Sequence, residues 1–140
     1  MSIIFNNESE YTVDFDLSNI DRLIKISLRD HKRLLGDISY IFCNDKYLLG
    51  INREFLQHDY LTDIITFNYC EGRKVSGDIF ISLERVSENS ISFDCSYIEE
   101  TIRVVMHGIL HLLGYNDHTE DEKSQMREME NYYITKYLSL

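Results

Sequence analysis

The chain has 140 residues, of which 44 % are hydrophobic and 27 % are charged, so it can bury a core and we expect one domain over residues 1–140. It has no low-complexity segment, no apolar run long enough to span a membrane and no signal peptide, which argues against disordered, membrane-spanning and secreted proteins. Its three widely separated cysteines, Cys43, Cys70 and Cys95, form no C-x-x-C pair and indicate reduced thiols in a cytoplasmic protein.

Hydrophobic periodicity and helix-capping residues predict short strands that alternate with helices. The first helix is expected to begin at a cap of Ser18 or Asn19 and to end near Leu34, before the helix-breaking Gly36. In chain order, the predicted elements are a strand at 3–5, a helix at about 18–34, a strand at 37–43, a helix at 44–55, strands at 64–67 and 78–82, and helices at about 83–91, 97–113 and 120–138. This order predicts an α+β fold, with a small mixed β-sheet of about four strands packed against several helices.

The formal net charge of −10 disfavours binding to nucleic-acid phosphates except at a local basic surface. Five basic residues fall within twelve positions of the first predicted helix: Arg22, Lys25, Arg29, Lys32 and Arg33. Most of them recur every three or four residues and would form a stripe along the helix. The stripe is either the solvent-exposed face of an amphipathic helix, which we favour, or one side of a groove that faces phosphates.

Two histidines, His107 and His111, lie four residues apart in the helix predicted at 97–113. Residues at this spacing share one face of a helix, so the two imidazoles could bind one transition metal. Gly114 would end the helix in a left-handed cap, and the returning chain offers Asp117 and His118 as a third ligand. Three protein ligands with an open position are typical of a catalytic zinc site. Core histidines without a metal are the alternative, but their burial would cost desolvation energy. We therefore predict one zinc ion per chain at the end of this long helix.

The stretch at 106–118 resembles the signature H-G-x-L-H-L-x-G-Y-D-H of the YbeY family of bacterial endoribonucleases. The segments at 61–67 and 77–82 resemble the family's P-T-D-V-L-S-F and G-D-I-x-I-S motifs, and Asn52 and Phe55 fit the preceding segment. The resemblance implies a zinc-dependent endoribonuclease specific for single-stranded RNA, acting in 16S rRNA 3′-end maturation and ribosome quality control. It also implies ribosomal RNA and the ribosome or its assembly proteins as partners.

The third metal ligand is ambiguous, because the family places its third histidine ten residues after the first. That position is Asp117 here, and His118 lies one residue later. Either Asn116 is an insertion and His118 binds the metal, or there is no gap and Asp117 does. We favour Asp117 because residue count sets the reach of a loop, and because carboxylate oxygen binds zinc at distances comparable to imidazole nitrogen.

Two other positions depart from zinc-enzyme patterns. Leu56 occupies the place of an arginine in the family, and the nearest basic residue is Arg53. Gly108 stands where H-E-x-x-H proteases have their general base, which argues against peptide hydrolysis. The departures leave two alternatives open: a non-catalytic zinc protein that binds the ribosome or an assembly factor, and a zinc hydrolase with a substrate other than RNA.

The sequence assigns no catalytic acid or base. Thr62, Asp63 and Asp78 flank the ends of predicted strands, where functional residues often lie. Asp63, or whichever of Asp117 and His118 does not bind the metal, is a candidate for protonating the leaving group.

Overall fold

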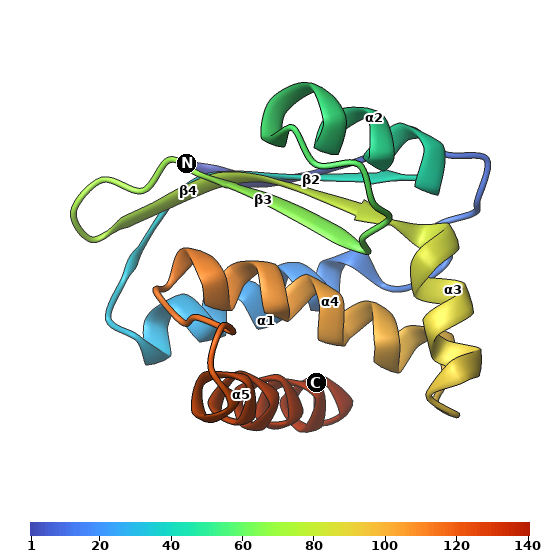
Figure 1. Cartoon of the computed structure of the whole chain (residues 1–140). Coiled ribbons are helices and arrows are strands. Elements are labelled where there is room, and N and C mark those ends of the chain that lie inside the picture. Colours follow the sequence, from blue (N-terminus) through green and yellow to red (C-terminus); the bar gives the residue numbers. More distant parts are fainter.

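One four-stranded β-sheet organises the chain in the computed structural model, which describes residues 1–140 (Figure 1). The elements in chain order are β1 Ser2–Asn7, α1 Leu17–Asp30, β2 Leu34–Cys43, α2 Asp45–Leu56, β3 Ile64–Asn68, β4 Lys74–Ser82, α3 Leu83–Ser92, α4 Tyr97–Leu112 and α5 Glu120–Leu138. The α+β fold with a mixed four-stranded sheet is therefore confirmed. None of the helices is both long and apolar enough to cross a bilayer.

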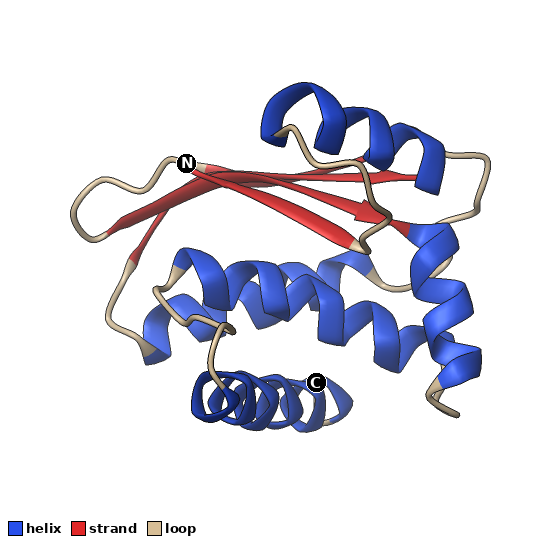
Figure 2. Cartoon of the chain, in the orientation of Figure 1, coloured by secondary structure: helices blue, strands red, loops and turns tan.

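The sheet has the strand order β1-β2-β4-β3. Strand β2 pairs in parallel with β1 and β4, and β3 pairs antiparallel with β4, so the short turn between β3 and β4 forms a hairpin. Figure 2 shows α2 on one face of the sheet and the layer of α1 and α4 on the other, with α5 packed beyond α4. This layering places α4 between the sheet and another helix.

Helix α4 is the most deeply buried helix, because its apolar residues face both the sheet and α5. The absence of a side chain at Gly108 allows the helix to approach the sheet closely, because a Cβ there would lie 3.0 Å from Ile79 Cγ2 and 3.1 Å from Ile64 Cδ1. These two isoleucines belong to β4 and β3, so the glycine sets the distance between α4 and the half of the sheet that ends near His107. The core thus fixes the helix that carries both histidines of the sequence motif.

The predicted boundaries of the first helix and the following strand are wrong. Helix α1 begins at Leu17, since Asp16 caps it by accepting a hydrogen bond from the backbone N–H of Asn19 at 3.2 Å. It ends at Asp30, and Lys32 adopts a left-handed conformation with φ of 56°. Lys32 and Arg33 therefore lie in the turn after α1, and the predicted basic stripe is shortened.

Pairing between strands overrides the local signals at two strand starts. Gly36 lies inside β2 rather than before it, because β2 pairs with β4 from Leu34 onward with a register shift after Leu35. A Cβ at Gly36 would lie 2.8 Å from the backbone carbonyl oxygen of Val75 and 2.0 Å from Ser76 Oγ, so a larger residue would force the strand to shift. Strand β4 likewise begins at Lys74 rather than at residue 78.

Replacing Gly77 in β4 with alanine should destabilise the protein. The new Cβ would lie 2.5 Å from the backbone carbonyl oxygen of Phe67 and 3.1 Å from Leu112 Cδ1, so the backbone must shift. We expect the free energy of unfolding to fall by about 1–3 kcal/mol, which thermal or urea denaturation would measure. Gly50 in α2 is a matched control, since no atom lies within 4 Å of its Cβ position and alanine there should stabilise the helix by about 0.5–1 kcal/mol. Equal unfolding energies for the two variants would contradict the close contact.

Candidate metal centre

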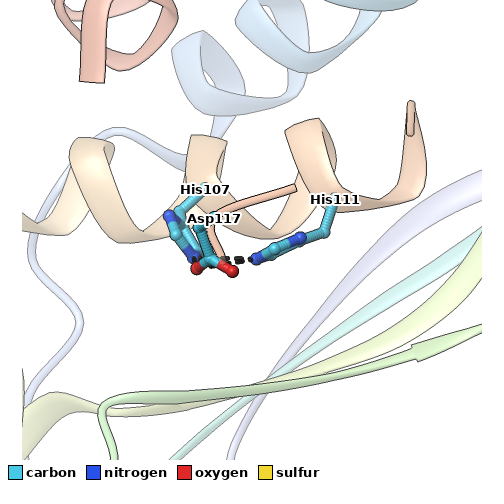
Figure 3. Close-up of side chains that lie close together, drawn as sticks. All are labelled: His107, His111 and Asp117. Atoms are coloured by element: carbon cyan, nitrogen blue, oxygen red, sulfur yellow. Dashed lines mark hydrogen bonds and ion pairs between the residues drawn. The ribbon is translucent and has the colours of Figure 1, made fainter. Parts of the chain in front are cut away.

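The turn after α4 brings the candidate ligands together. The helix ends with the backbone N–H of Tyr115 donating to the carbonyl of Leu110 at 3.0 Å, and Gly114 takes the left-handed conformation with φ of 105°. This is the glycine cap expected from the sequence. The chain then reverses and carries Asp117 back toward the face of α4 that holds both histidines (Figure 3).

Three side chains converge on one point in Figure 3. His107 Nε2 and His111 Nε2 lie 3.0 Å apart, and Asp117 Oδ2 lies 3.3 Å from each of them. Together they form a group that could hold a metal ion. His118 is outside this group and exposed, although its side chain lines the neighbouring cleft. The structure thus places Asp117, and not His118, beside the two histidines.

The other nitrogen of each imidazole has a partner that orients the ring. His107 Nδ1 lies 2.7 Å from Glu130 Oε2, and His111 Nδ1 lies 3.0 Å from the carbonyl oxygen of Tyr115. A carboxylate and a carbonyl accept hydrogen bonds, so each Nδ1 donates its hydrogen and each Nε2 lone pair points to the shared centre. Two lone pairs and a carboxylate oxygen at this separation repel one another unless a proton or a metal ion lies between them.

The spacing of these donors fits a small transition-metal ion. With zinc at about 2.0–2.1 Å from each ligand, tetrahedral geometry would separate the ligand atoms by about 3.3–3.4 Å. The two separations to Asp117 Oδ2 are 3.3 Å and the one between the histidines is 3.0 Å. Little movement is therefore needed for three ligands to share one ion.

A buried network of charges supports His107 from behind. Glu130 is only 5 % exposed, and its Oε1 accepts a hydrogen bond from Arg103 Nη1 at 3.1 Å. Glu100, 3 % exposed, lies 3.9 Å from Arg103 Nε, and burial together with the charge of Asp63 raises its pKa to about 7. Burial opposes a charge on His107, but the hydrogen bond and charge of Glu130 raise its pKa overall. The network keeps the ring of His107 in a fixed orientation.

No sequence pattern predicted a role for Glu130, Arg103 or Glu100. A signal for Glu130 was present, since it continues a buried stripe of α5 that is otherwise formed by Met126, Tyr133 and Ile134. A carboxylate in an apolar stripe needs a partner, and its partners are 23 and 27 residues away along the chain, on α4. Their identity depends on how the two helices pack.

A cleft of about 690 Å³ opens beside the three side chains. Its wall is formed mainly by the end of α2, the following loop, β3 and the end of α4. The lining residues include Asn52, Leu56, His58, Tyr60, Thr62, Asp63, Thr66, His107, His111, Asp117 and His118. No lysine or arginine lines the cleft, so no other cation takes the place of the arginine expected at position 56. Arg53, the nearest basic residue in sequence, pairs with Asp59 on the exposed surface.

Of the other residues predicted for the site, some line the cleft and others do not. Asp63 is half-buried at the start of β3 and lines the cleft, and burial raises its pKa. Thr62 also lines the cleft, whereas Asp78 lies within β4, opposite Phe67, and does not. None of the basic residues of α1 lines the cleft, which agrees with a solvent-exposed face.

The fold and this site define a class: an α+β protein whose central helix presents two histidines, and the loop after it an aspartate, to a polar cleft. The sequence profile of the family described as Endoribonuclease YbeY matches residues 4–138. The chain belongs to this family.

Several proteins named Endoribonuclease YbeY are similar over most of their length. The one from Bacteroides fragilis is 46 % identical over 131 residues, which cover 94 % of each chain. The one from Flavobacterium johnsoniae is 44 % identical over 135 residues, or 96 % of each chain, and the one from Parabacteroides distasonis is 53 % identical over 108 residues, covering 77 % of this chain and 76 % of the relative. The solution structure of TM1509 from Thermotoga maritima shares the fold with a TM-score of 0.66 at 23 % identity, covering 98 % of this chain and 89 % of that one.

The position of Asp117 predicts that it matters more for zinc binding than its neighbour. We expect Asp117→Ala to weaken zinc affinity severely, because it removes a donor atom that lies 3.3 Å from both histidines. His118→Ala should cost about 10–100-fold or less, as changes outside the ligand set do. Zinc titration against a competing chelator would measure both. A larger loss for His118→Ala would show that the loop rearranges when the metal binds.

Glu130→Gln should weaken zinc binding although Glu130 does not face the shared centre. Removing its charge weakens the hydrogen bond that orients His107, and losses of this kind reduce metal affinity by about 10–100-fold. Glu128→Gln removes the same charge from an exposed position of the same helix and should leave affinity unchanged. Circular dichroism of the metal-free proteins would separate loss of affinity from unfolding. Identical affinities for the two variants would contradict the role of Glu130.

Proposed function

We propose that the protein is a cytoplasmic, zinc-dependent endoribonuclease that cleaves single-stranded RNA, with one zinc ion held by His107, His111 and Asp117. The observation that carries the proposal is the convergence of these three donors on a point that borders an open cleft. Three protein ligands with an accessible remaining position are typical of catalytic zinc, whereas structural sites are closed by four. A role in 16S rRNA 3′-end maturation and ribosome quality control is supported by membership of the family.

The metal ion and the residues around it would have different roles in RNA cleavage. An ion held by His107, His111 and Asp117 would supply Lewis-acid chemistry and lower the pKa of water toward neutral pH. Glu130 and the carbonyl of Tyr115 keep both imidazoles turned toward the shared centre. Asp63 is our candidate for carrying a proton to the leaving oxygen, since it lines the same cleft and its pKa is raised by burial.

Peptide hydrolysis of the H-E-x-x-H type is disfavoured by the packing of α4. The general base of those enzymes would stand at Gly108, whose missing side chain faces Ile79 and Ile64 in the sheet at 3.0–3.2 Å. A glutamate there would collide with the core instead of reaching the metal. The substrate is therefore better sought among phosphodiesters than among peptides.

A non-catalytic zinc protein that binds the ribosome or an assembly factor is the second candidate. The observation that favours it is the cleft itself, which offers no lysine or arginine to a phosphate. A zinc hydrolase with a substrate other than RNA has the same ligand set. The three hypotheses share the metal centre and differ in what happens to RNA.

A paired measurement of metal content and RNA cleavage tests the proposal. The wild type should contain one zinc ion per chain and cleave a fluorescent single-stranded RNA but not a duplex. His107→Ala/His111→Ala should lose both properties, because it removes two of the three donors. Zinc-free wild type from the same preparation, before and after zinc is restored, controls for contaminating nuclease.

Full zinc occupancy in the double variant would contradict the ligand assignment, and undiminished cleavage by it would contradict the enzyme assignment. A zinc-loaded wild type that binds ribosomes without cleaving RNA would favour the non-catalytic alternative.

A further inference from the structure

Two surfaces of different chemistry meet at the candidate metal centre. His107 and Asp117 line the cleft described above and also a second cavity of about 300 Å³ on the side of α5. Aromatic rings lie on the wall of the cleft, whereas Lys123 and Arg127 line the second cavity. Because the ligands separate the two, a molecule bound across the centre would touch both surfaces.

The aromatic side is a stacked pair of rings. The ring centroids of His58 and Tyr60 lie 5.2 Å apart with an interplanar angle of 22°, and Tyr60 Oη lies 3.0 Å from His58 Nδ1. Tyr60 nevertheless remains 57 % exposed and lines the cleft. The pair therefore presents aromatic surface to whatever occupies the cleft.

The loop that carries these rings is anchored. Asn52, only 2 % exposed, donates from Nδ2 to the carbonyl oxygen of Tyr60 at 2.9 Å, and the backbone carbonyl oxygen of Asn52 accepts from the backbone N–H of His58 at 3.1 Å. The same asparagine lines the cleft. Holding an aromatic side chain in place before binding reduces the entropy lost when a ligand stacks on it.

The second cavity has the cations that the cleft lacks, and its two carboxylates, Asp117 and Glu130, are already paired with the histidines and with Arg103. Lys123 and Arg127 lie one helical turn apart on α5, and no carboxylate lies within ion-pair distance of Arg127. Lys123 is 3.7 Å from Glu120 in an exposed pair, which contributes little. In a chain with net charge −10, these are the basic residues that share a cavity with both His107 and Asp117.

We propose that the stacked pair of His58 and Tyr60 binds an unpaired base and that Lys123 and Arg127 bind the backbone phosphate on the other side of the metal centre. This inference rests on the proposed function and names how the same site takes its substrate. Every base has a face that can stack on an aromatic ring, whereas paired bases in a duplex are already stacked. The arrangement thus selects single strands by their bases, although the cleft has no cation.

The test compares how two variants change binding and its dependence on salt. The probe is a short fluorescent phosphorothioate oligonucleotide that resists hydrolysis, titrated with zinc-loaded full-length protein at several salt concentrations. Tyr60→Ala should weaken binding by about 5–150-fold, the range for loss of one stacked base, without changing the salt dependence. Arg127→Gln should reduce the slope of log affinity against log salt by about 0.7, the value for one phosphate contact on a single strand.

Matched controls are available for both variants. Tyr69→Ala removes another tyrosine that is 57 % exposed but does not line the cleft, and it should not change binding. Lys46→Gln removes an exposed cation of α2 outside both cavities and should leave the salt slope unchanged. Tyr60→Phe should keep most of the affinity, and an abasic oligonucleotide should bind Tyr60→Ala and wild type equally.

Equal affinity of Tyr60→Ala and wild type, or no measurable binding by the wild type, would overturn the base-binding assignment. An unchanged salt slope in Arg127→Gln would overturn the phosphate assignment. Because the probe is not cleaved, these results are independent of the nuclease activity. Loss of binding in Tyr60→Ala, with no cleavage of ordinary RNA by any variant, would leave the inference standing while the proposed reaction fails.

Discussion

Close packing of α4 against the sheet is the constraint on which the rest of the structure depends. Gly108 lets the helix approach β3 and β4 until Ile79 Cγ2 lies 3.0 Å from its Cβ position. At that depth, His107 and His111 border the edge of the sheet, and the next turn can return Asp117 to them. A side chain at Gly108 would push the helix away and move both imidazoles relative to the cleft.

The same packing explains why buried charges are tolerated near the centre. Glu100 and Glu130 lie between α4 and its neighbours, where water cannot solvate them well, and Arg103 bridges the two. An isolated carboxylate in such a place would cost several kcal/mol or take up a proton. Here Glu130 accepts hydrogen bonds from both Arg103 and His107, so the buried carboxylate has partners and also orients a candidate metal ligand.

Local patterns predicted the type of every element and the α+β fold, but not all of their ends. Helix α1 and strand β4 deviate most, because α1 already ends at Asp30, before the left-handed Lys32, and because β4 extends along β2 as far as Lys74. Gly36 was expected to interrupt structure, yet it lies inside β2, where the backbone of Val75 and the side chain of Ser76 leave no room for a Cβ. Pairing between distant strands decided these positions, and a single segment carries no information about its partner.

The sequence by itself determined that His107 and His111 share one face, because a spacing of four residues is fixed by the geometry of any α-helix. It also determined the glycine cap after them. Only the tertiary structure shows that Asp117, rather than His118, lies beside the two histidines, since the direction of each side chain depends on the path of the loop from α4 to α5. The same holds for Glu130, whose contact with His107 spans 23 residues, and for the cleft, whose wall comes from segments far apart in the chain. Such contacts depend on how the elements pack together, which local sequence does not specify.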